Sequence, residues 1–260
     1  MLAVDIGNSR VKVADYAPDG SRSFKSSFTL PRRASVDDCA TALKHLYLLY
    51  GKSPFIDGAA ISSVVPTLTP SFYGALEKHF GVTPLVIGPG VKTGLNIRVE
   101  NAASVGADIV IGAVGALSEF RPPLLIINMG TATTFTGIDS DAMMIGVSIM
   151  PGLLMGLDAL AEKASELSPI ALGRVKSPFG RNTVESMNSG AILGAAGAVD
   201  GYIDIAAEAL VKSGTSDAAV TAVLTGGCAK FVAPYLKNKA EFRESLCLDG
   251  LWRIWKNNQN

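Results

Sequence analysis

Two short glycine-containing runs combine residue types that can bind phosphate. The first run and the lysine after it comprise Asp5, Ile6, Gly7, Asn8, Ser9 and Lys12. Backbone N–H groups of a tight turn, with Asn and Ser side chains, can donate to phosphate oxygens, and glycine lets the backbone come close. Asp5 would repel a phosphate, so its natural role is to hold Mg²⁺ or its waters, while Lys12 supplies positive charge. The alternative is a plain β-hairpin turn, which Asp, Gly and Asn also favour.

The second run lies in the other half of the chain and comprises Gly130, Thr131, Ala132, Thr133 and Thr134. Threonine hydroxyls and backbone amides at such a strand–turn–strand can bind a γ-phosphate. The alternative is strand propensity alone, because Thr is a good strand former. Taken together, the two runs favour an ATP-dependent kinase, in which a pair of phosphate loops faces a cleft.

Two further motifs offer groups for the acceptor side of such a reaction. Asp108, in the run Val105–Asp108, lies near the start of a predicted apolar helix and could accept a hydroxyl proton as a general base. The alternative is that the helix dipole simply stabilises an acidic residue there. Thr183 begins another predicted helix, as its N-cap or as a ligand. The run Thr225–Gly227 ends a predicted strand and is either an anion site or a plain βα turn.

Apolar periodicity predicts how these motifs are positioned. Strands are expected at residues 2–4, 11–16, 23–30, 58–65, 84–87, 124–127, 132–137, 143–150 and 220–224. Helices are expected at 36–50, 69–80, 104–120, 153–163 and 183–212, and another after residue 227. Strands grouped in threes and then alternating with helices indicate an α/β fold. The strand–turn–strand pattern that opens the chain recurs at residue 124, which suggests an internal duplication.

Composition narrows the functional class. The 260 residues carry a formal net charge of +0, so no basic patch points to nucleic acid or a membrane surface. The three cysteines form no C-x-x-C pair, which argues against a disulfide framework or a zinc site and favours a reducing compartment. No signal peptide is recognisable, and uninterrupted apolar runs fall far short of the roughly 20 residues that span a bilayer. We therefore expect a cytoplasmic protein.

In their order along the chain, these motifs resemble those of the type III pantothenate kinases. The matching segments are 5–9, 87–95, 105–108, 130–134, 149–152, 182–183, 189–190, 225–227 and the terminal 248–251 before Asn258. The resemblance covers the whole chain. It implies an α/β fold of two duplicated actin-like (RNase H-like) lobes with a nucleotide cleft between them, and a homodimer. The expected activity is ATP-dependent phosphorylation of pantothenate to 4'-phosphopantothenate, the first step of coenzyme A biosynthesis. The Arg121–Pro123 break places the lobes at 1–120 and 121–260.

The resemblance also assigns roles to residues. ATP with Mg²⁺ is expected at Asp5, Gly7, Asn8, Ser9, Lys12, Gly130 and Thr131, with Asp5 holding Mg²⁺ through water. Asp108 is expected to accept the proton. The pantothenate pocket is expected to be lined by Val99, Gly106, Ala107, Ile109 and Thr183, partly across the dimer.

Five positions depart from the family pattern. Ile109 replaces the usual Arg, Val99 an aromatic residue, Ala102 a proline and Thr136 an aspartate. Asn128 replaces the carboxylate that resembles the ligand of a monovalent cation, K⁺ or NH₄⁺. These changes leave open an alternative: a family member with altered catalysis, acting as a nucleotide-binding regulatory protein or as a kinase for another small alcohol.

Overall fold

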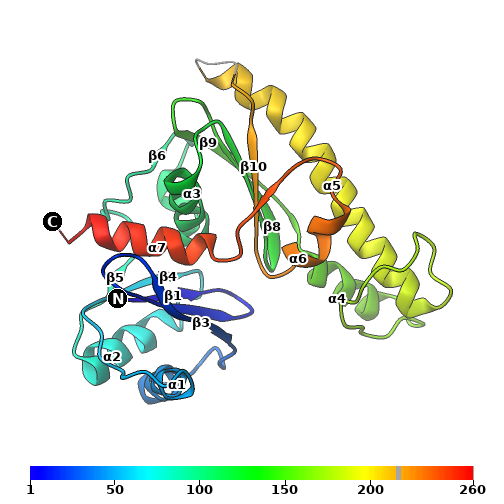
Figure 1. Cartoon of the computed structure of the whole chain (residues 1–260). Coiled ribbons are helices and arrows are strands. Elements are labelled where there is room, and N and C mark those ends of the chain that lie inside the picture. The colour runs from blue at the N-terminus through cyan, green and yellow to red at the C-terminus, as the bar shows by residue number, and fades with distance from the viewer. Residues whose placement is uncertain (215–217, 260) are drawn as a thin grey trace. The chain divides into compact units, whose positions relative to one another are not determined.

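The computed structural model describes residues 1–214 and 218–259, which form two compact units (Figure 1). Unit 1 comprises Met1–Leu95, Asn101–Ser118 and Leu246–Asn260, and unit 2 comprises Asn96–Glu100 and Glu119–Ser245. The junction at Ser118 and Glu119 lies two residues before the predicted boundary. The C-terminal helix, in contrast, packs with the N-terminal sheet. The segments 1–120 and 121–260 therefore stay a prediction about domains, whereas the compact units are discontinuous in sequence.

Unit 1 is built on a five-stranded sheet with the order β3-β2-β1-β4-β5. Its strands are β1 (Leu2–Ile6), β2 (Val11–Tyr16), β3 (Arg22–Phe28), β4 (Ala59–Ser63) and β5 (Leu85–Val86). The first three strands pair antiparallel, and β4 and β5 add in parallel. Its helices are α1 (Val36–Leu49), α2 (Thr69–Phe80), the 3-10 turn η1 (Ala102–Ser104), α3 (Ala107–Glu119) and α7 (Leu246–Asn257).

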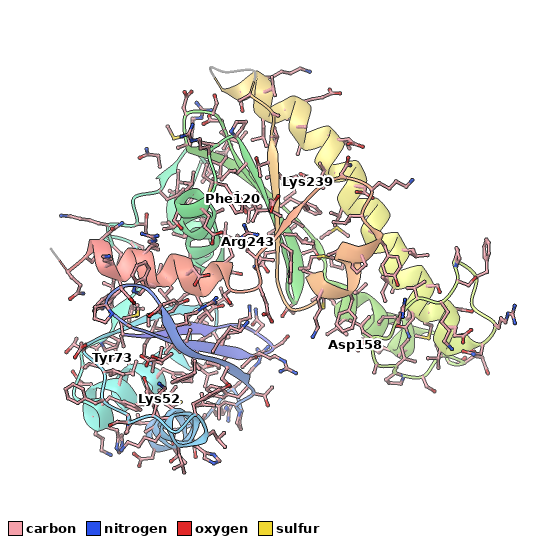
Figure 2. All side chains as sticks on the ribbon, viewed as in Figure 1. Lys52, Tyr73, Phe120, Asp158, Lys239 and Arg243 are labelled. Carbon is pink, nitrogen blue, oxygen red and sulfur yellow. The ribbon has the colours of Figure 1, made fainter. Side chains whose placement is uncertain are left out.

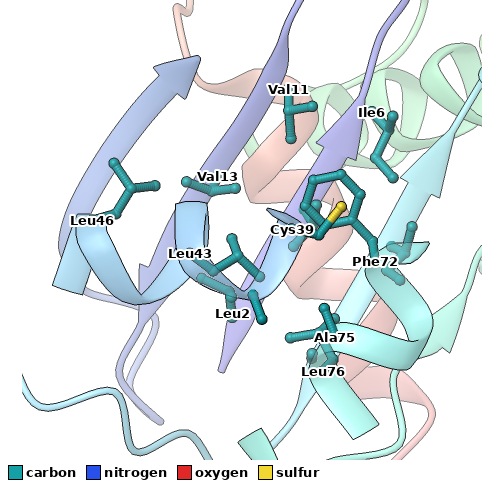
Figure 3. Close-up of a cluster of buried hydrophobic side chains, with 14 of the residues drawn as sticks. Leu2, Ile6, Val11, Val13, Cys39, Leu43, Leu46, Phe72, Ala75 and Leu76 are labelled. Atoms are coloured by element: carbon teal, nitrogen blue, oxygen red, sulfur yellow. The ribbon is translucent and has the colours of Figure 1, made fainter. Parts of the chain in front are cut away.

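The period-2 alternation of the strands divides the residues of this sheet between two faces. Leu2, Val4 and Ile6 join Val11 and Val13 on the face that α1 and α2 cover (Figure 3). These side chains are at most 2% exposed, so the face is a dry apolar core. It anchors the sheet whose opposite face carries the polar residues of β1 and β2.

Helix α7 covers that opposite face by packing on β1, β2 and β4. Small side chains let it approach closely, because Ala3, Ala14 and Ala60 are fully buried there. The aromatic residues of α7 need still more room: a Cβ at Gly20 would lie 2.7 Å from the Trp252 ring, and one at Gly58 would lie 2.6 Å from the Trp255 ring. The apolar stripe of α7 thus explains why the end of the chain belongs to unit 1.

Unit 2 repeats the same strand order. Its six-stranded sheet runs β11-β10-β7-β8-β9-β6, so that β9-β8-β7-β10-β11 corresponds to β3-β2-β1-β4-β5 of unit 1. The directions of pairing also agree, antiparallel among β7, β8 and β9 and parallel from β7 to β10 and β11. The strands are β6 (Asn96–Ile97), β7 (Leu124–Met129), β8 (Ala132–Ile138), β9 (Met143–Pro151), β10 (Thr221–Thr225) and β11 (Glu241–Phe242). The predicted duplication is confirmed at the level of topology.

Helices α4 (Leu153–Lys163), α5 (Thr183–Ser213), α6 (Ala229–Val232) and the 3-10 turn η2 (Ala233–Tyr235) complete unit 2. Helix α5 packs against β7, β8, α4 and α6 and contributes Ile192, Ala196 and Val199 to the core. Of the helices in the described residues, it is the one whose length and apolar composition could cross a membrane. A helix laid along a sheet meets the same criterion, so this composition assigns no membrane.

The predicted elements lie where the periodicity placed them, but strands β6 and β11 and helix α7 were not predicted, and one predicted helix is shorter than expected. The two-residue strand β6, which pairs in parallel with β9, was not predicted because two residues carry no periodicity. The helix after residue 227 is the four-residue α6, shorter than the run of apolar residues suggests, because Pro234 interrupts it.

The segment between β11 and α7 is held by an ion pair. Arg243 donates to Glu119 at 2.6 Å, and its guanidinium stacks 4.9 Å from the Phe120 ring centre (Figure 2). This contact fixes the segment before α7.

Candidate functional site

An ion pair between a buried carboxylate and a partly exposed lysine lies on the α7-facing side of unit 1. Asp5 and Lys12 are register partners on β1 and β2, and Lys12 Nζ lies 3.7 Å from Asp5 Oδ2. Ser62 on β4 donates to Asp5 Oδ1 at 3.2 Å. Burial raises the pKa of Asp5, and the positive charge of Lys12 opposes that rise. Burial, the largest single influence, acts to lower the pKa of Lys12, but its acidic neighbours, Asp5 first and then Cys247 and Asp108, together outweigh burial and raise that pKa, so that Lys12 stays cationic.

The turn between β1 and β2 places backbone beside this pair. Gly7 donates to the carbonyl of Arg10 at 3.0 Å, which closes the turn, and Asn8 and Ser9 are exposed at its tip. A Cβ at Gly7 would lie 3.1 Å from the Arg10 carbonyl oxygen, so the position favours glycine. The structure thus contains the hairpin of the alternative interpretation, and it is compatible with the phosphate-binding one, because the tip leaves polar groups open to solvent.

Asp108 approaches the same pair from helix α3. It lies in the first turn, partly exposed, and its charge contributes to the raised pKa of Asp5. Its carboxylate folds back over Gly106, since a Cβ there would lie 2.6 Å from Asp108 Oδ1. The thiol of Cys247 on α7 lies 4.0 Å from the Asp108 carbonyl oxygen. Unit 1 therefore gathers two carboxylates, one ammonium group and one exposed turn.

The second run forms a tight turn in unit 2 that two other glycines enclose. Gly130 donates to the carbonyl of Ala132 at 3.0 Å, and Thr131 is exposed at the turn. A Cβ at Gly152 would lie 2.1 Å from the Thr131 carbonyl oxygen. Gly226 has φ of 101° and packs on the backbone of Met129, where a Cβ would lie 2.5 Å from the nearest atoms. The double-glycine motif thus supports the turn by allowing backbone contact.

Asn128 occupies the position in unit 2 that Asp5 occupies in unit 1. Each lies near the end of the strand that begins the three antiparallel strands of its sheet, two residues before the glycine of its turn. Each also has a hydroxyl residue as its partner on the parallel neighbouring strand, Ser62 beside Asp5 and Thr225 beside Asn128. In the described residues, the buried Asn128 Oδ1 has no hydrogen-bond partner. An unsatisfied buried oxygen is a natural ligand for a cation.

The expected acceptor residues are distributed over several elements. Gly106, Ala107 and Ile109 lie partly exposed at the start of α3, beside Asp108, and Val99 follows β6 in unit 2. Thr183 is the first residue of α5 and lines a hollow of about 450 Å³ between α4 and α5. The prediction of Thr183 as N-cap was wrong: Asn182 caps the helix, accepting from the Glu185 N–H at 2.9 Å. Asn is a better N-cap residue than Thr, which agrees with this assignment.

The residues around Asp5 are suited to hold a divalent cation weakly and do not form a dedicated set of metal ligands. Among the residues that the structure describes, no group of three or more His, Cys, Asp or Glu side chains could hold a metal ion. Mg²⁺ in nucleotide sites is commonly held by one or two carboxylates together with substrate phosphates and water. Asp5, buried and aligned beside the exposed turn, matches that requirement. All three cysteines are free and buried.

Sequence reasoning missed three contributors to the site. Ser62 and Cys247 were overlooked because neither lies in a glycine-containing motif. Gly152 lies in the matching segment 149–152 but was given no role, although it contacts the turn at Gly130 and Thr131. The available signal for Ser62 was its place at the end of a predicted buried strand, where polar residues line one edge of an α/β sheet.

Comparisons with known proteins agree with this arrangement. A sequence model described as type III pantothenate kinase matches residues 1–205. The type III pantothenate kinase of Anaeromyxobacter sp. is 35% identical over 260 residues, covering 100% of both chains. That of Geobacter sulfurreducens is 34% identical over 265 residues, covering 100% of this chain and 99% of its own.

A solved structure also shares the fold. A Campylobacter jejuni protein described as a conserved Baf family transcriptional activator superposes with a TM-score of 0.57 at 19% identity, covering 100% of both chains. At that sequence identity, the structural similarity shows only that the two proteins share a fold. The duplicated sheets are those of the actin-like fold, as the resemblance implied. On the full-length identity of its relatives and the match to the family's sequence model, the chain belongs to the type III pantothenate kinase family.

Proposed function

We propose that the chain phosphorylates pantothenate with ATP to give 4'-phosphopantothenate, the step that opens coenzyme A biosynthesis. One observation carries the proposal on the structural side: Asp5, Lys12 and Asp108 gather at one edge of the unit 1 sheet. A phosphoryl transferase needs a carboxylate for the metal, a fixed positive charge for the phosphates and a base for the hydroxyl. Full-length relatives named for this activity support the same conclusion.

In the proposed reaction, Asp108 accepts the proton of the pantothenate primary alcohol as its oxygen attacks the γ-phosphorus of ATP. The bond from that phosphorus to the β–γ bridging oxygen breaks, and ADP leaves. Lys12, kept cationic by Asp5 together with its other acidic neighbours, stabilises charge on the phosphate oxygens. Asp108 suits the role of base because it is partly exposed, whereas Asp5 is buried and already engaged with Ser62 and Lys12.

We assign nucleotide binding to both of the glycine-containing runs. In the proposal, the backbone and side chains of Gly7, Asn8 and Ser9 donate to phosphate oxygens, and Gly130 and Thr131 do the same from unit 2. Asp5 would hold Mg²⁺ through a water, which places its negative charge near the metal instead of against phosphate. When bound, the metal supplies charge neutralisation for the transferring phosphoryl group.

A monovalent cation is assigned to Asn128. Its buried Oδ1 offers an oxygen without a charge, so we expect K⁺ or NH₄⁺ to be held weakly and the rate to depend little on K⁺. Asn128→Asp should make activity depend on K⁺, with a rise of roughly tenfold, because charge-assisted contacts gain about 1.5–3 kcal/mol. The rate is measured with KCl and with a large organic cation at equal ionic strength, so that screening stays constant. A steep K⁺ requirement of the unsubstituted protein would contradict the assignment.

Ile109 changes the character of the proposed pantothenate pocket. Pantothenate is a carboxylate at neutral pH, and the Arg that the family usually has next to Asp108 could bind it through charge-assisted hydrogen bonds. Losing such a contact costs roughly 1.5–3 kcal/mol. We propose that Ile109 and Val99 offer apolar contacts to the substrate's carbon chain instead, and that the remaining polar contacts come from Gly106, Ala107 and Thr183.

The proposed activity is tested by coupled ADP release with purified protein, ATP and Mg²⁺, with and without pantothenate. Pantothenate-dependent ADP release, with 4'-phosphopantothenate identified by mass, is the expected result. Absence of release while ATP still raises the melting temperature would reject pantothenate as the acceptor. It would favour a nucleotide-binding regulator or a kinase for another small alcohol, which a panel of alcohols then distinguishes.

We also propose that the protein is a cytoplasmic homodimer and that unit 2 supplies the interface. Exposed apolar side chains concentrate on α4 and around α5, where Leu154, Met155, Leu160 and Ile205 are each 45% exposed or more. Contiguous exposed apolar surface commonly marks an association site. Light scattering after size exclusion should give twice the 27.0 kDa chain mass, and Leu160→Glu should give the monomer. A monomeric unsubstituted protein would contradict the proposal.

A further inference from the structure

The C-terminal helix α7 lies between the unit 1 sheet and helix α3, which carries Asp108. Its contacts with the sheet are with β1, β2 and β4. Its closest contacts with α3 are of a different kind, because they join backbone to backbone. The terminal motif at residues 248–251 falls within this helix and has no part in the proposed chemistry.

Two facing glycines make the contact between α3 and α7. A Cβ at Gly250 of α7 would lie 1.8 Å from the Ile111 carbonyl oxygen and 2.7 Å from the Gly115 nitrogen. A Cβ at Gly115 of α3 would lie 2.2 Å from the Leu246 carbonyl oxygen. Neither helix has room for a methyl group at this crossing, so the separation of the helices is set by backbone contact instead of by adaptable side chains.

The other end of the contact reaches the first turn of α3. The Cys247 thiol, one turn before Gly250, lies 4.0 Å from the Asp108 carbonyl oxygen and 3.7 Å from where a Cβ at Gly112 would be. Burial raises the pKa of Cys247 to about 12, so it packs here as a neutral thiol. Helix α7 therefore contacts α3 at the residue proposed as the base and again at Ile111 and Gly115, about one and two turns further on.

Polar and aromatic contacts also join helix α7 to the sheet that carries Asp5 and Lys12. Tyr16 on β2 donates to Asp249 at 2.6 Å, and Arg22 on β3 lies 3.7 Å from the same carboxylate oxygen. The Tyr16 and Trp252 rings stack with centres 5.9 Å apart. Asp249 and Gly250 are neighbours, so the residue that fixes α7 to the sheet adjoins the residue that fixes α3 to α7.

We propose that Gly250 is a positioning residue for phosphoryl transfer: through the contact of α7 with α3, it holds Asp108 at a fixed place beside Asp5 and Lys12. The inference rests on the proposed function, in which Asp108 accepts the acceptor's proton. Displacing α3 moves Asp108 while leaving the β1–β2 turn, which is part of the sheet, in place. Transfer and nucleotide binding should therefore respond differently.

The test is Gly250→Ala in the full-length protein. The expected result is a fall in kcat of about tenfold, since small displacements of reacting groups are costly, with the KM for ATP unchanged within about twofold. Amide exchange in a peptide covering residues 106–118 should become faster, while exchange in β1 and β2 should not. Arg253→Ala, on the exposed side of α7, should leave all three quantities unchanged.

A control variant separates positioning from a general loss of stability. Leu43→Ala weakens the core on the opposite face of the sheet and should lower the melting temperature without lowering kcat when assayed well below it. If Gly250→Ala does not fold, Cys247→Val, which adds bulk against the first turn of α3, takes its place with the same expected split.

The outcomes distinguish the two proposals. A folded Gly250→Ala protein with the kcat of the unsubstituted protein would overturn the positioning role, as would an equal loss of kcat in Leu43→Ala. An unsubstituted protein that releases no ADP with pantothenate would overturn the proposed function instead. In that case, the rate of amide exchange in residues 106–118 would still show whether α7 fixes the position of α3.

Discussion

Asp108→Asn is expected to reduce pantothenate-dependent ADP release by about 10²–10⁴-fold, the usual contribution of a general base. The amide is nearly the same size as the carboxylate but cannot accept the proton. Nucleotide binding should stay near normal, because Asp108 lies on α3 whereas the proposed phosphate-binding turn lies between β1 and β2. The rate is measured by coupled ADP release, and binding by the ATP-induced shift in melting temperature.

The matched control is Asp57→Asn, which removes one exposed carboxylate of unit 1 away from the site and should leave kcat unchanged. Removing the charge of Asp108 also removes one of the influences that raise the pKa of Asp5, so ATP binding should not weaken at neutral pH. Full turnover by Asp108→Asn would mean that another group accepts the proton and would withdraw Asp108 from the mechanism.

Gly152→Ala is expected to weaken ATP binding by roughly 100-fold. The new methyl group would lie 2.1 Å from the Thr131 carbonyl oxygen and 2.6 Å from that of Gly130, so the turn proposed to bind phosphate must move. Loss of one or two charge-assisted hydrogen bonds, each worth about 1.5–3 kcal/mol, accounts for the size of the effect. Isothermal titration with a non-hydrolysable ATP analogue measures it directly.

Gly156→Ala provides the matched comparison. It makes the same chemical change four residues later, in α4, where a Cβ would meet no atom within 4 Å. Ala is favoured over Gly inside a helix by about 1 kcal/mol, so this variant should be slightly more stable and should bind ATP normally. Unchanged ATP affinity in folded Gly152→Ala would show that the turn at Gly130 and Thr131 does not contribute to the nucleotide site.

Much of the fold followed from the sequence because its signals are local. The alternation of Leu2, Val4 and Ile6 identifies a strand and its buried face, and the helical spacing of residues 36–50 identifies α1. The strand–turn–strand repeat at residues 1 and 124 predicted the duplication that the strand orders confirm. Identities at the motifs were also sufficient to recognise the family, which the relatives confirm.

Other features depended on contacts between segments far apart in the chain. The place of α7 in unit 1 could not be predicted, since its apolar stripe fits any complementary surface and gives no partner. The pairing of Tyr16 with Asp249 joins residues 233 positions apart, for which the sequence offers no register. The two-residue strands β6 and β11 exist only because longer strands beside them provide a partner.

By itself, the sequence identified the residues that we propose to carry chemistry: the carboxylates Asp5 and Asp108, the cation Lys12 and the glycines of the two turns. Only the tertiary structure decided what surrounds them. It placed Asn128 as the counterpart of Asp5, set Gly152 and Gly226 against the second turn, and set α7 against α3. The physical reason is the separation along the sequence over which each property acts. Side-chain chemistry and strand alternation are properties of neighbouring residues, whereas close backbone approach and desolvation arise where distant segments meet.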